Sequence, residues 1–342
     1  MGGAPSGDES SAHVQSANVP AAAWQQLTSP EQAGWSADGL EKVHSYIEEI
    51  GSTSVMIVQH GVIVAAWGDI DHRSNLHSAR KSLLNSLIGI AVARGQINRD
   101  DTLTKLGIDD EPPSLTDAER QAKVRDLLEA RSGIYHVAAY ETNGMQEQRP
   151  PRGSHAPGTF WYYNNWYFNA LGTIYEQATG TSIFEAFYQQ IARPIGMQDF
   201  TPRDGRYVHS DESRFPAYVF DLSARDFARF ALLYLNGGRW NGVQVVPEDW
   251  VQASTQPYSD APSGGYGYLW WTGNSAGGTA ADIPFPKDSF WAEGHLGQYA
   301  VVVPSLDLIV VNRVDSKLTK RSVSKRQIAH LVRLVLSAAP RG

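Results

Sequence analysis

The hydrophobic positions near the start of the chain predict a helix followed by a β-hairpin. After Ser36, a residue type that commonly caps helices, apolar residues recur at the spacing of one helix face, at Leu40, Val43, Ile47 and Ile50. Gly51 is placed to end this helix. Two runs rich in β-branched residues follow, Ser54–Gln59 and Val62–Trp67, and a His-Gly pair separates them. This arrangement is typical of two antiparallel strands joined by a tight turn.

A longer apolar pattern over Ser78–Arg94 predicts the next helix, which Gly95 would end. From Gln96 to about Arg214, helical patterns alternate with loops rich in proline and glycine, so we expect a mainly helical lobe there. The helices expected in this lobe are Asp117–Ala130, Phe168–Thr179 and Ser182–Ala192.

The last third of the chain returns to strands. Helices are predicted over Ser223–Asn236 and, at the end, over Val323–Leu336. Between them lie four strand-like runs, Gly267–Trp271, Ser289–Glu293, Tyr299–Val303 and Leu308–Asn312. A hairpin, a helical insertion, more strands and a terminal helix predict an α+β fold, in which helices flank an antiparallel β-sheet.

The same pattern divides the chain into three parts. We expect a flexible N-terminal extension over 1–34, an α/β sheet domain made of 35–95 and 215–342, and an inserted, mainly helical lobe over 96–214. The length of 342 residues allows about two domains. Because 42% of the residues are hydrophobic and 19% are charged, the chain can bury a substantial core and does not have a disordered composition.

Charge and composition narrow the choice of partners and compartments. The formal net charge is −7, so no basic surplus favours nucleic acid or an anionic membrane surface. The chain has no cysteine, which excludes disulfides, thiolate metal sites and a cysteine nucleophile. No apolar run approaches the roughly 18 residues of a spanning helix. The start of the chain has no signal-peptide pattern, so we expect a periplasmic or secreted protein if a signal was removed, and a cytoplasmic one otherwise.

A candidate nucleophile stands at the start of the second predicted helix, in the S-x-x-K sequence Ser78-Ala79-Arg80-Lys81. The spacing puts Ser78 and Lys81 on one helix face, about one turn apart. A serine hydroxyl needs a base, and a lysine can serve once burial, nearby cations or the helix N-terminus keep its amine neutral. A second copy ends at Lys325 in a basic run, and we interpret it as the solvated start of a surface helix.

Two further short sequences carry groups that such chemistry uses. In Tyr163-Asn164-Asn165 the phenol can pass a proton to a leaving group, and an amide can hold a lysine or a substrate carbonyl. In Gly294-His295-Leu296-Gly297 the histidine can donate a hydrogen bond, and glycines let a substrate lie along a strand edge. Each of these two short sequences, taken alone, also fits a purely structural role. Y-x-N in particular occurs three more times in the chain.

Other chemistries find little support in the chain. Residues 273–277 match the G-x-S-x-G of a nucleophile elbow, but no helical pattern follows them, so we interpret Ser275 as part of a surface loop. The histidines are scattered, and we find no compact metal-binding motif and no phosphate-binding glycine loop. We therefore predict no metal and no cofactor.

Taken in order, S-x-x-K, Y-x-N and H-x-G resemble the three motifs of the serine β-lactamase/penicillin-binding-protein-like superfamily. The chain is most similar to the class C β-lactamase-related group, which includes family VIII esterases, D-aminopeptidases and D-Ala-D-Ala carboxypeptidases. The likeness runs from about Trp35 to the C-terminus, and it implies a β-lactamase/transpeptidase-like fold. Pro157-Gly158 and Leu171-Gly172, which frame the middle motif, select Tyr163 among its neighbours. Other similar segments are Ser223–Phe230, Tyr266–Trp271 and Gly294–Gln298.

The resemblance implies a role for each residue of the first two motifs. Ser78 would be the nucleophile that becomes acylated, and water would then hydrolyse the acyl-enzyme. Lys81 and Tyr163 would share the duties of general base and general acid. Asn165 would hold Lys81 or the amide of the substrate.

At the third motif the resemblance implies binding roles, and the chain departs from the usual pattern. His295 and Gly297 would line the strand edge opposite the nucleophile, and the backbone N–H groups of Ser78 and Gln298 would form an oxyanion hole. Class C β-lactamases usually carry lysine where this chain has His295. Since histidine is mostly neutral at pH 7, this change disfavours a true β-lactamase without excluding carboxylate substrates.

Three functions remain open from the sequence. The first is a cofactor-independent serine hydrolase, above all a carboxylesterase on small esters. The second keeps the mechanism but cleaves a β-lactam, a D-amino-acid peptide or another amide, and the third is a non-catalytic protein that binds cell-wall peptides. Aromatic residues near the motifs fit either a pocket wall or the core, namely Trp161, Trp166, Tyr167, Trp270, Trp271 and Trp291.

Overall fold

The structure is a computed structural model that describes residues 19–111, 113–262, 264–276 and 285–340. Its helices are α1 (Ala37–Ile50), α2 (Arg80–Ala93), α3 (Leu103–Leu106), α4 (Val124–Leu128), α5 (Asn143–Glu147), α6 (Asn165–Thr179), α7 (Ile183–Phe187), α8 (Ala224–Leu235), α9 (Glu248–Ser254), α10 (Ser316–Thr319) and α11 (Lys325–Ala338). Its strands are β1 (Ser54–Gln59), β2 (Val62–Gly68), β3 (Ser74–Asn75), β4 (Gly205–Ser210), β5 (Ser213–Leu222), β6 (Arg239–Trp240), β7 (Val243–Gln244), β8 (Ser259–Ala261), β9 (Gly264–Tyr266), β10 (Trp271–Thr272), β11 (Phe290–Gly294), β12 (Gln298–Val303) and β13 (Leu308–Arg313).

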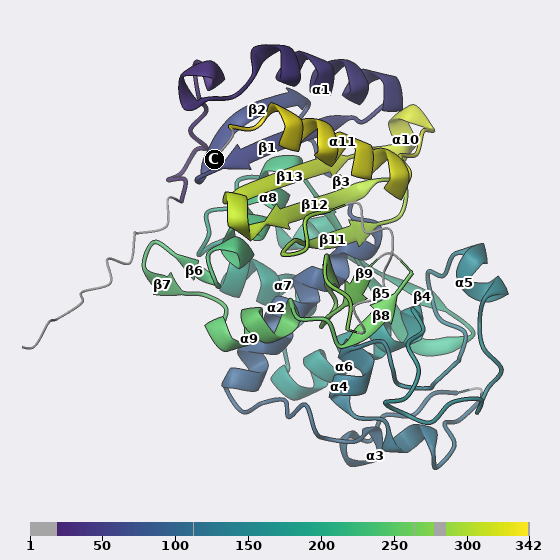
Figure 1. The fold of residues 1–342 in the computed structure, drawn as a ribbon. Helices are drawn as coiled ribbons and strands as arrows, with labels where there is room; N and C mark the ends of the chain where they lie inside the picture. Colours follow the sequence, from purple (N-terminus) through teal and green to yellow (C-terminus); the bar gives the residue numbers. More distant parts are fainter. Residues whose placement is uncertain (1–18, 112, 263, 277–284, 341–342) are drawn as a thin grey trace, which may run out of the picture.

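Eight strands form the main sheet, in the order β2-β1-β13-β12-β11-β10-β9-β8 (Figure 1). Each neighbouring pair is antiparallel, which confirms the predicted fold class. Strand β13 joins the first hairpin to the later strands, because Val310 lies opposite Ile57 of β1 on one side and Val301 of β12 on the other. Segments far apart in the sequence therefore build the centre of one sheet.

Helices cover both faces of this sheet. Alternate side chains of a strand point to opposite faces, so Val55 and Ile57 pack against α1 and α11, whereas Met56 and Val58 join the core formed with α2 and α8. Figure 1 shows α1 and α11 together over one face and α8 behind the sheet. As predicted, Ser36 caps α1 and Gly51 ends it in a left-handed conformation.

A second, smaller sheet was not predicted. It has the order β3-β5-β4, and most of it lies within or next to the segment that we expected to be helical. β4 is half-buried and rich in polar residues, so it lacks the apolar alternation that identifies a strand.

Two predicted elements differ from the structure. Of the expected strand Gly267–Trp271, only Trp271 is in a strand, as the first residue of β10. Residues 267–270 form a buried turn, in which the Gly267 N–H donates to the Trp270 carbonyl and Leu269 has a φ of 59°. The expected helix Asp117–Ala130 is interrupted and consists of a short 3-10 turn, Glu119–Gln121, and α4. Lys123 between them is extended and forms a β-bridge with Thr102.

The N-terminal extension is described only in part, since residues 1–18 lie outside the described residues. The segment 19–34 contacts the sheet domain. The Trp24 indole donates to the Arg225 carbonyl (3.2 Å), and the Leu27 N–H donates to the Ile63 carbonyl (2.8 Å). The division of the chain into domains stays a prediction.

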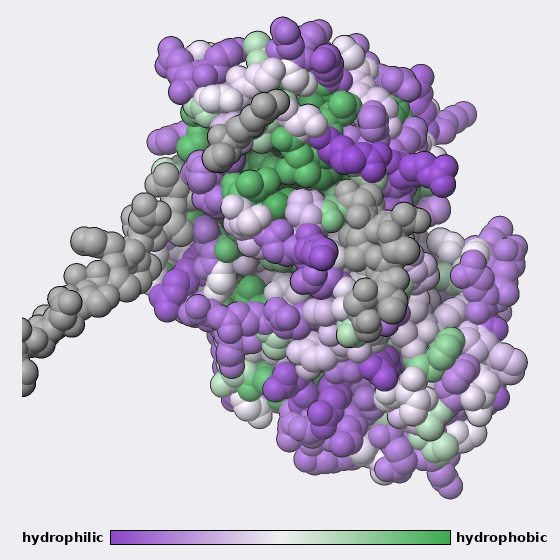
Figure 2. All heavy atoms as spheres, viewed as in Figure 1, coloured by the Kyte–Doolittle hydropathy of each residue, from purple (hydrophilic) through white to green (hydrophobic). Residues whose placement is uncertain are grey.

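The surface seen in Figure 2 is polar over most of its area, with apolar residues gathered around α11 and the strands beside it. Among the helices in the described part of the chain, none is both long and apolar enough to cross a bilayer.

Candidate active site

Ser78 lies in a single tight turn, His77–Ala79, that runs directly into α2. His77 has a φ of 49°, which is uncommon for a residue other than glycine. Its N–H donates to the side-chain oxygen of Asn75 (2.8 Å), and this contact supports the left-handed conformation. The turn presents Ser78 to a cavity at the start of the helix.

Lys81, one turn after Ser78, is the centre of a hydrogen-bonded group. Its Nζ lies 2.8 Å from the Ser78 hydroxyl, 2.8 Å from the Tyr163 hydroxyl and 2.9 Å from Oδ1 of Asn165. Asn165 Nδ2 donates to the Tyr140 carbonyl, so the oxygen of the same amide faces the lysine. The structure therefore brings together four residues of the predicted site, Ser78, Lys81, Tyr163 and Asn165.

Burial sets the protonation of this group. Lys81 is only 1% exposed, and desolvation, helped by the charge of Arg80, lowers the pKa of Lys81 well below its usual range. Burial raises the pKa of the Tyr163 phenol, although its hydrogen bond with Ser78 opposes that shift. The site thus pairs an amine that is readily neutral with a phenol that keeps its proton. The lone pair of a neutral amine can accept the proton of Ser78.

The N-terminus of α6 delivers Asn165 to the site. Asn164 caps this helix, because its side-chain oxygen accepts from the Trp166 N–H (3.2 Å). The Nδ2 of Asn164 also donates to the His136 carbonyl (3.1 Å), which ties the helix start to the loop before it.

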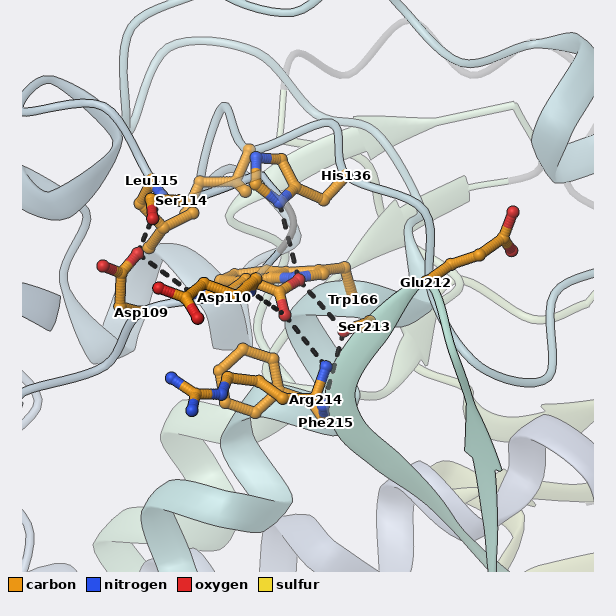
Figure 3. Close-up of polar contacts among 12 residues, drawn as sticks. Asp109, Asp110, Ser114, Leu115, His136, Trp166, Glu212, Ser213, Arg214 and Phe215 are labelled. Carbon is orange, nitrogen blue, oxygen red and sulfur yellow. Dashed lines mark hydrogen bonds and ion pairs between the residues drawn. The ribbon is translucent and has the colours of Figure 1, made fainter.

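A buried polar cluster anchors the same helix end (Figure 3). Oδ2 of Asp110 accepts from the Trp166 indole (2.7 Å) and from the Ser213 hydroxyl (3.0 Å). Oδ1 of Asp110 accepts from the Arg214 N–H (2.9 Å). His136 faces Asp110 at an ion-pair distance of 3.5 Å. This cluster was not predicted, since its members are scattered along the chain.

The third motif meets the nucleophile turn at the end of β11. A Cβ atom on Gly294 would lie only 2.1 Å from the Leu76 carbonyl oxygen, so glycine alone allows the strand to approach this closely. His295 follows and lines the same cavity as Ser78. The H-x-G motif predicted His295 as a site residue, whereas nothing in the sequence indicated the close approach at Gly294.

The structure brings neither Gly297 nor Gln298 to the lining of the two hollows at Ser78, as far as the described residues go. Gly297 has a φ of 107°, which favours glycine. Gln298 lies opposite Gly294 in the sheet, and its side chain is buried and accepts from Nε of Arg313 (2.7 Å). The part predicted for its backbone N–H in an oxyanion hole stays a prediction.

Two adjoining hollows of about 360 Å³ and 620 Å³ border Ser78. The smaller has an aromatic wall that includes Trp161 and Trp271, and the ring of Trp271 stacks on Tyr163 at 5.7 Å. The other tryptophans near the motifs, and Tyr167, are fully buried in the core. The described residues include no group of three or more histidine, aspartate or glutamate side chains that could hold a metal ion.

The second S-x-x-K copy stands at the start of a helix, α11, as predicted, and Ser322 is exposed. Lys325 itself is half-buried and also lines the smaller hollow, which was not predicted. Its Nζ lies 2.8 Å from Glu293 Oε2 and 4.3 Å from the centre of the Trp271 ring. α11 begins beside the end of β11, a tertiary contact that the local sequence does not encode.

Comparisons with known proteins agree with this fold. The sequence model of the Beta-lactamase family matches residues 40–332. An uncharacterized protein of Alkalihalophilus pseudofirmus is 24% identical over 318 residues, which cover 80% of this chain and 87% of that protein.

Solved structures are similar in fold at low sequence identity. A Bacillus anthracis protein assigned as a 6-aminohexanoate-dimer hydrolase matches with a TM-score of 0.69 and 17% identity, covering 93% of this chain and 89% of its own. A penicillin-binding protein of Bacillus halodurans matches with a TM-score of 0.62 and 16% identity, covering 86% of this chain and 99% of its own.

The family match spans most of the chain, from within α1 to within α11, and it includes the elements that carry all three motifs. The fold and its structural neighbours agree with that match. The chain therefore belongs to the beta-lactamase family and is a serine hydrolase.

Proposed function

We propose that this protein is a carboxylesterase that cleaves small esters through an acyl-enzyme on Ser78. The observation that carries the proposal is the contact between Ser78 Oγ and a buried Lys81 amine whose pKa is lowered. A neutral amine at 2.8 Å is within reach of the serine proton.

Acylation follows from these contacts. Ser78 Oγ attacks the ester carbonyl carbon as its proton passes to Lys81 Nζ, and a tetrahedral oxyanion forms. Two backbone N–H groups, those of Ser78 and Gln298, would stabilise this oxyanion. The C–O bond to the leaving group then breaks, and the alkoxide takes a proton from the Tyr163 hydroxyl, which Lys81 reprotonates.

Deacylation uses the same residues in the reverse direction. Water attacks the acyl carbon and passes one proton to the Tyr163 oxygen, while the Tyr163 proton moves to neutral Lys81 Nζ. The bond between the acyl carbon and Ser78 Oγ then breaks, Lys81 returns the proton to Ser78 Oγ, and the carboxylic acid leaves. The Asn165 amide oxygen accepts from Lys81 in both steps and holds the amine between Ser78 and Tyr163.

The aromatic wall supports a small ester as the substrate. Trp161 and Trp271 offer an apolar surface next to Ser78, which suits short acyl chains. His295 stands where class C β-lactamases usually carry a permanent cation. Cleavage of β-lactams or D-peptides by the same serine is the second candidate, because the acylation chemistry is shared, and a binding protein without catalysis is the third.

Side-by-side hydrolysis of p-nitrophenyl butyrate and a chromogenic cephalosporin tests this proposal. We expect ester turnover to exceed cephalosporin turnover, and Ser78→Ala to lower kcat for the ester by about three orders of magnitude or more. Ser322→Ala, the serine of the second S-x-x-K copy, is the matched control and should retain wild-type rates.

The other outcomes identify the alternatives. Faster cephalosporin than ester turnover, lost in Ser78→Ala, would replace the esterase with a β-lactamase. No turnover of either substrate by the wild-type protein would favour D-peptide substrates or a binding protein. Full activity of Ser78→Ala would contradict the mechanism itself.

A further inference from the structure

A second lysine contributes to the cavity at Ser78, from the opposite end of the chain. Lys325 is the first residue of α11, and its side chain is 26% exposed. It lines the same hollow as Ser78 and His295. A lysine is electrostatically unfavourable at the positive N-terminal end of a helix, so the stability of α11 does not explain this choice of residue.

The ammonium of Lys325 has hydrogen-bonding capacity left for a ligand. Among the described residues its Nζ has one ion-pair partner, Glu293 Oε2 at 2.8 Å, although an ammonium carries three donors. The Trp271 ring at 4.3 Å holds the cation from one side without using an N–H group.

Glu293 is less available than Lys325. Its Oε2 accepts from the Trp291 indole (3.0 Å) as well as from Lys325. A substrate ammonium would have to compete for that oxygen, whereas a substrate anion finds donors on Lys325 that no described residue uses. Of the described residues that line this hollow, Lys325 is the one lysine or arginine.

From this geometry we infer that Lys325 is a specificity-determining residue that binds a carboxylate on the substrate, beside the Trp271 ring in the hollow that Ser78 lines. The inference rests on the proposed function, because it assigns a substrate class to the same active site. Glu293 keeps the cation in place when the cavity is empty and is partly displaced when a substrate carboxylate binds. The carboxylate can belong to the acyl group or to the leaving group, and the test separates the two.

Paired substrates that differ in one charge test the inference. On the acyl side, the mono-p-nitrophenyl ester of glutaric acid is compared with p-nitrophenyl pentanoate. On the leaving-group side, the butyryl ester of 4-hydroxybenzoate is compared with that of 4-hydroxybenzamide. In one of these pairs, Lys325→Gln should lower the ratio of kcat/KM for the anionic over the neutral ester by about tenfold or more.

Two further variants complete the design. Glu293→Gln removes the competing carboxylate and should raise the same ratio, while Arg326→Gln removes an exposed positive charge one residue away and should leave the ratio unchanged. Unchanged ratios for Lys325→Gln in both pairs, or an equal fall for Arg326→Gln, would overturn the inference. If the wild-type protein hydrolyses none of these esters in a way that depends on Ser78, the proposed function itself is refuted.

Discussion

Lys81 differs from a surface lysine in two ways, because it is buried and has no carboxylate among its hydrogen-bond partners. Its hydrogen-bond partners are three neutral oxygens, those of Ser78, Tyr163 and Asn165, so none stabilises an ammonium as a carboxylate would. Desolvation comes first among the causes that lower the pKa of Lys81, and the positive charge of Arg80 adds to it. The reactivity of Ser78 therefore depends on keeping water and anions away from one amine.

The lowered pKa of Lys81 predicts how kcat/KM for a soluble ester, corrected for spontaneous hydrolysis, depends on pH. Only neutral Lys81 accepts the Ser78 proton, so activity should rise with pH through the lowered pKa of Lys81. It should reach its plateau well below pH 10.5, the usual lysine value. Because burial raises the pKa of Tyr163, kcat/KM should not fall near pH 10.0, the usual pKa of tyrosine. A rate that rises only near pH 10.5 would contradict the neutral-amine assignment.

Contacts between residues of one motif could be predicted from the sequence, whereas contacts between distant segments could not. Ser78 and Lys81 are one helical turn apart, and this spacing alone suggested that they touch. Lys325 ends the second S-x-x-K copy, and the helix start predicted there is present. Its place beside the cavity was missed, since nothing near it in sequence indicates that α11 begins beside β11. The close approach at Gly294 likewise depends on a carbonyl from another segment.

At the scale of elements, the N-terminus of α6 is held by a cluster of buried charges. His136 lies 3.5 Å from Asp110 and 3.8 Å from Glu119, and Arg152 pairs with Glu119 at 2.7 Å. Burial opposes a charge on His136, but the two carboxylates outweigh it and raise the pKa of the imidazole. The cluster thus supports the loop and helix end that position Asn165.

Replacing His136 with glutamine should make the free energy of unfolding less dependent on pH. The raised pKa means that charged His136 contributes its full stability below about pH 6.5, the unfolded value, and that this contribution is lost as the pH rises through the folded pKa. Where it is present, we expect the wild type to exceed His136→Gln by about 1–3 kcal/mol in denaturant unfolding.

The exposed His209 is the matched control, and His209→Gln should follow the wild-type pH profile. A constant difference between wild type and His136→Gln from pH 5 to 9 would show that His136 contributes packing rather than charge.

Helices with a clear apolar period and an N-cap residue could be predicted. Segments whose backbone hydrogen bonds go to residues distant in the sequence could not. α1, α8 and α11 begin after serine caps at Ser36, Ser223 and Ser324 and lie where they were expected. The turn at 267–270 resembles a strand in sequence because it is aromatic and buried. Its carbonyls instead accept hydrogen bonds from Ser82 and Asn85 of α2.

At the scale of the whole molecule, the site lies where the main sheet, the small sheet and the helical segments meet. Arg313 on β13 is buried at this junction, and it donates to the Ser74 and Leu222 carbonyls of the small sheet and to the Gln298 side chain of the main sheet. The sequence predicted the overall α+β architecture. It could not predict this cross-link, because an arginine at the end of an apolar strand carries no sign of its distant partners.

Peptide mapping by mass spectrometry can show whether Ser78 is the residue that becomes acylated. The protein is quenched in acid during turnover of p-nitrophenyl butyrate, digested, and searched for a butyryl adduct. We predict the adduct on the peptide that contains Ser78, and its absence in Ser78→Ala. An adduct on the peptide of Ser275 or Ser322, or steady turnover by Ser78→Ala, would contradict the account.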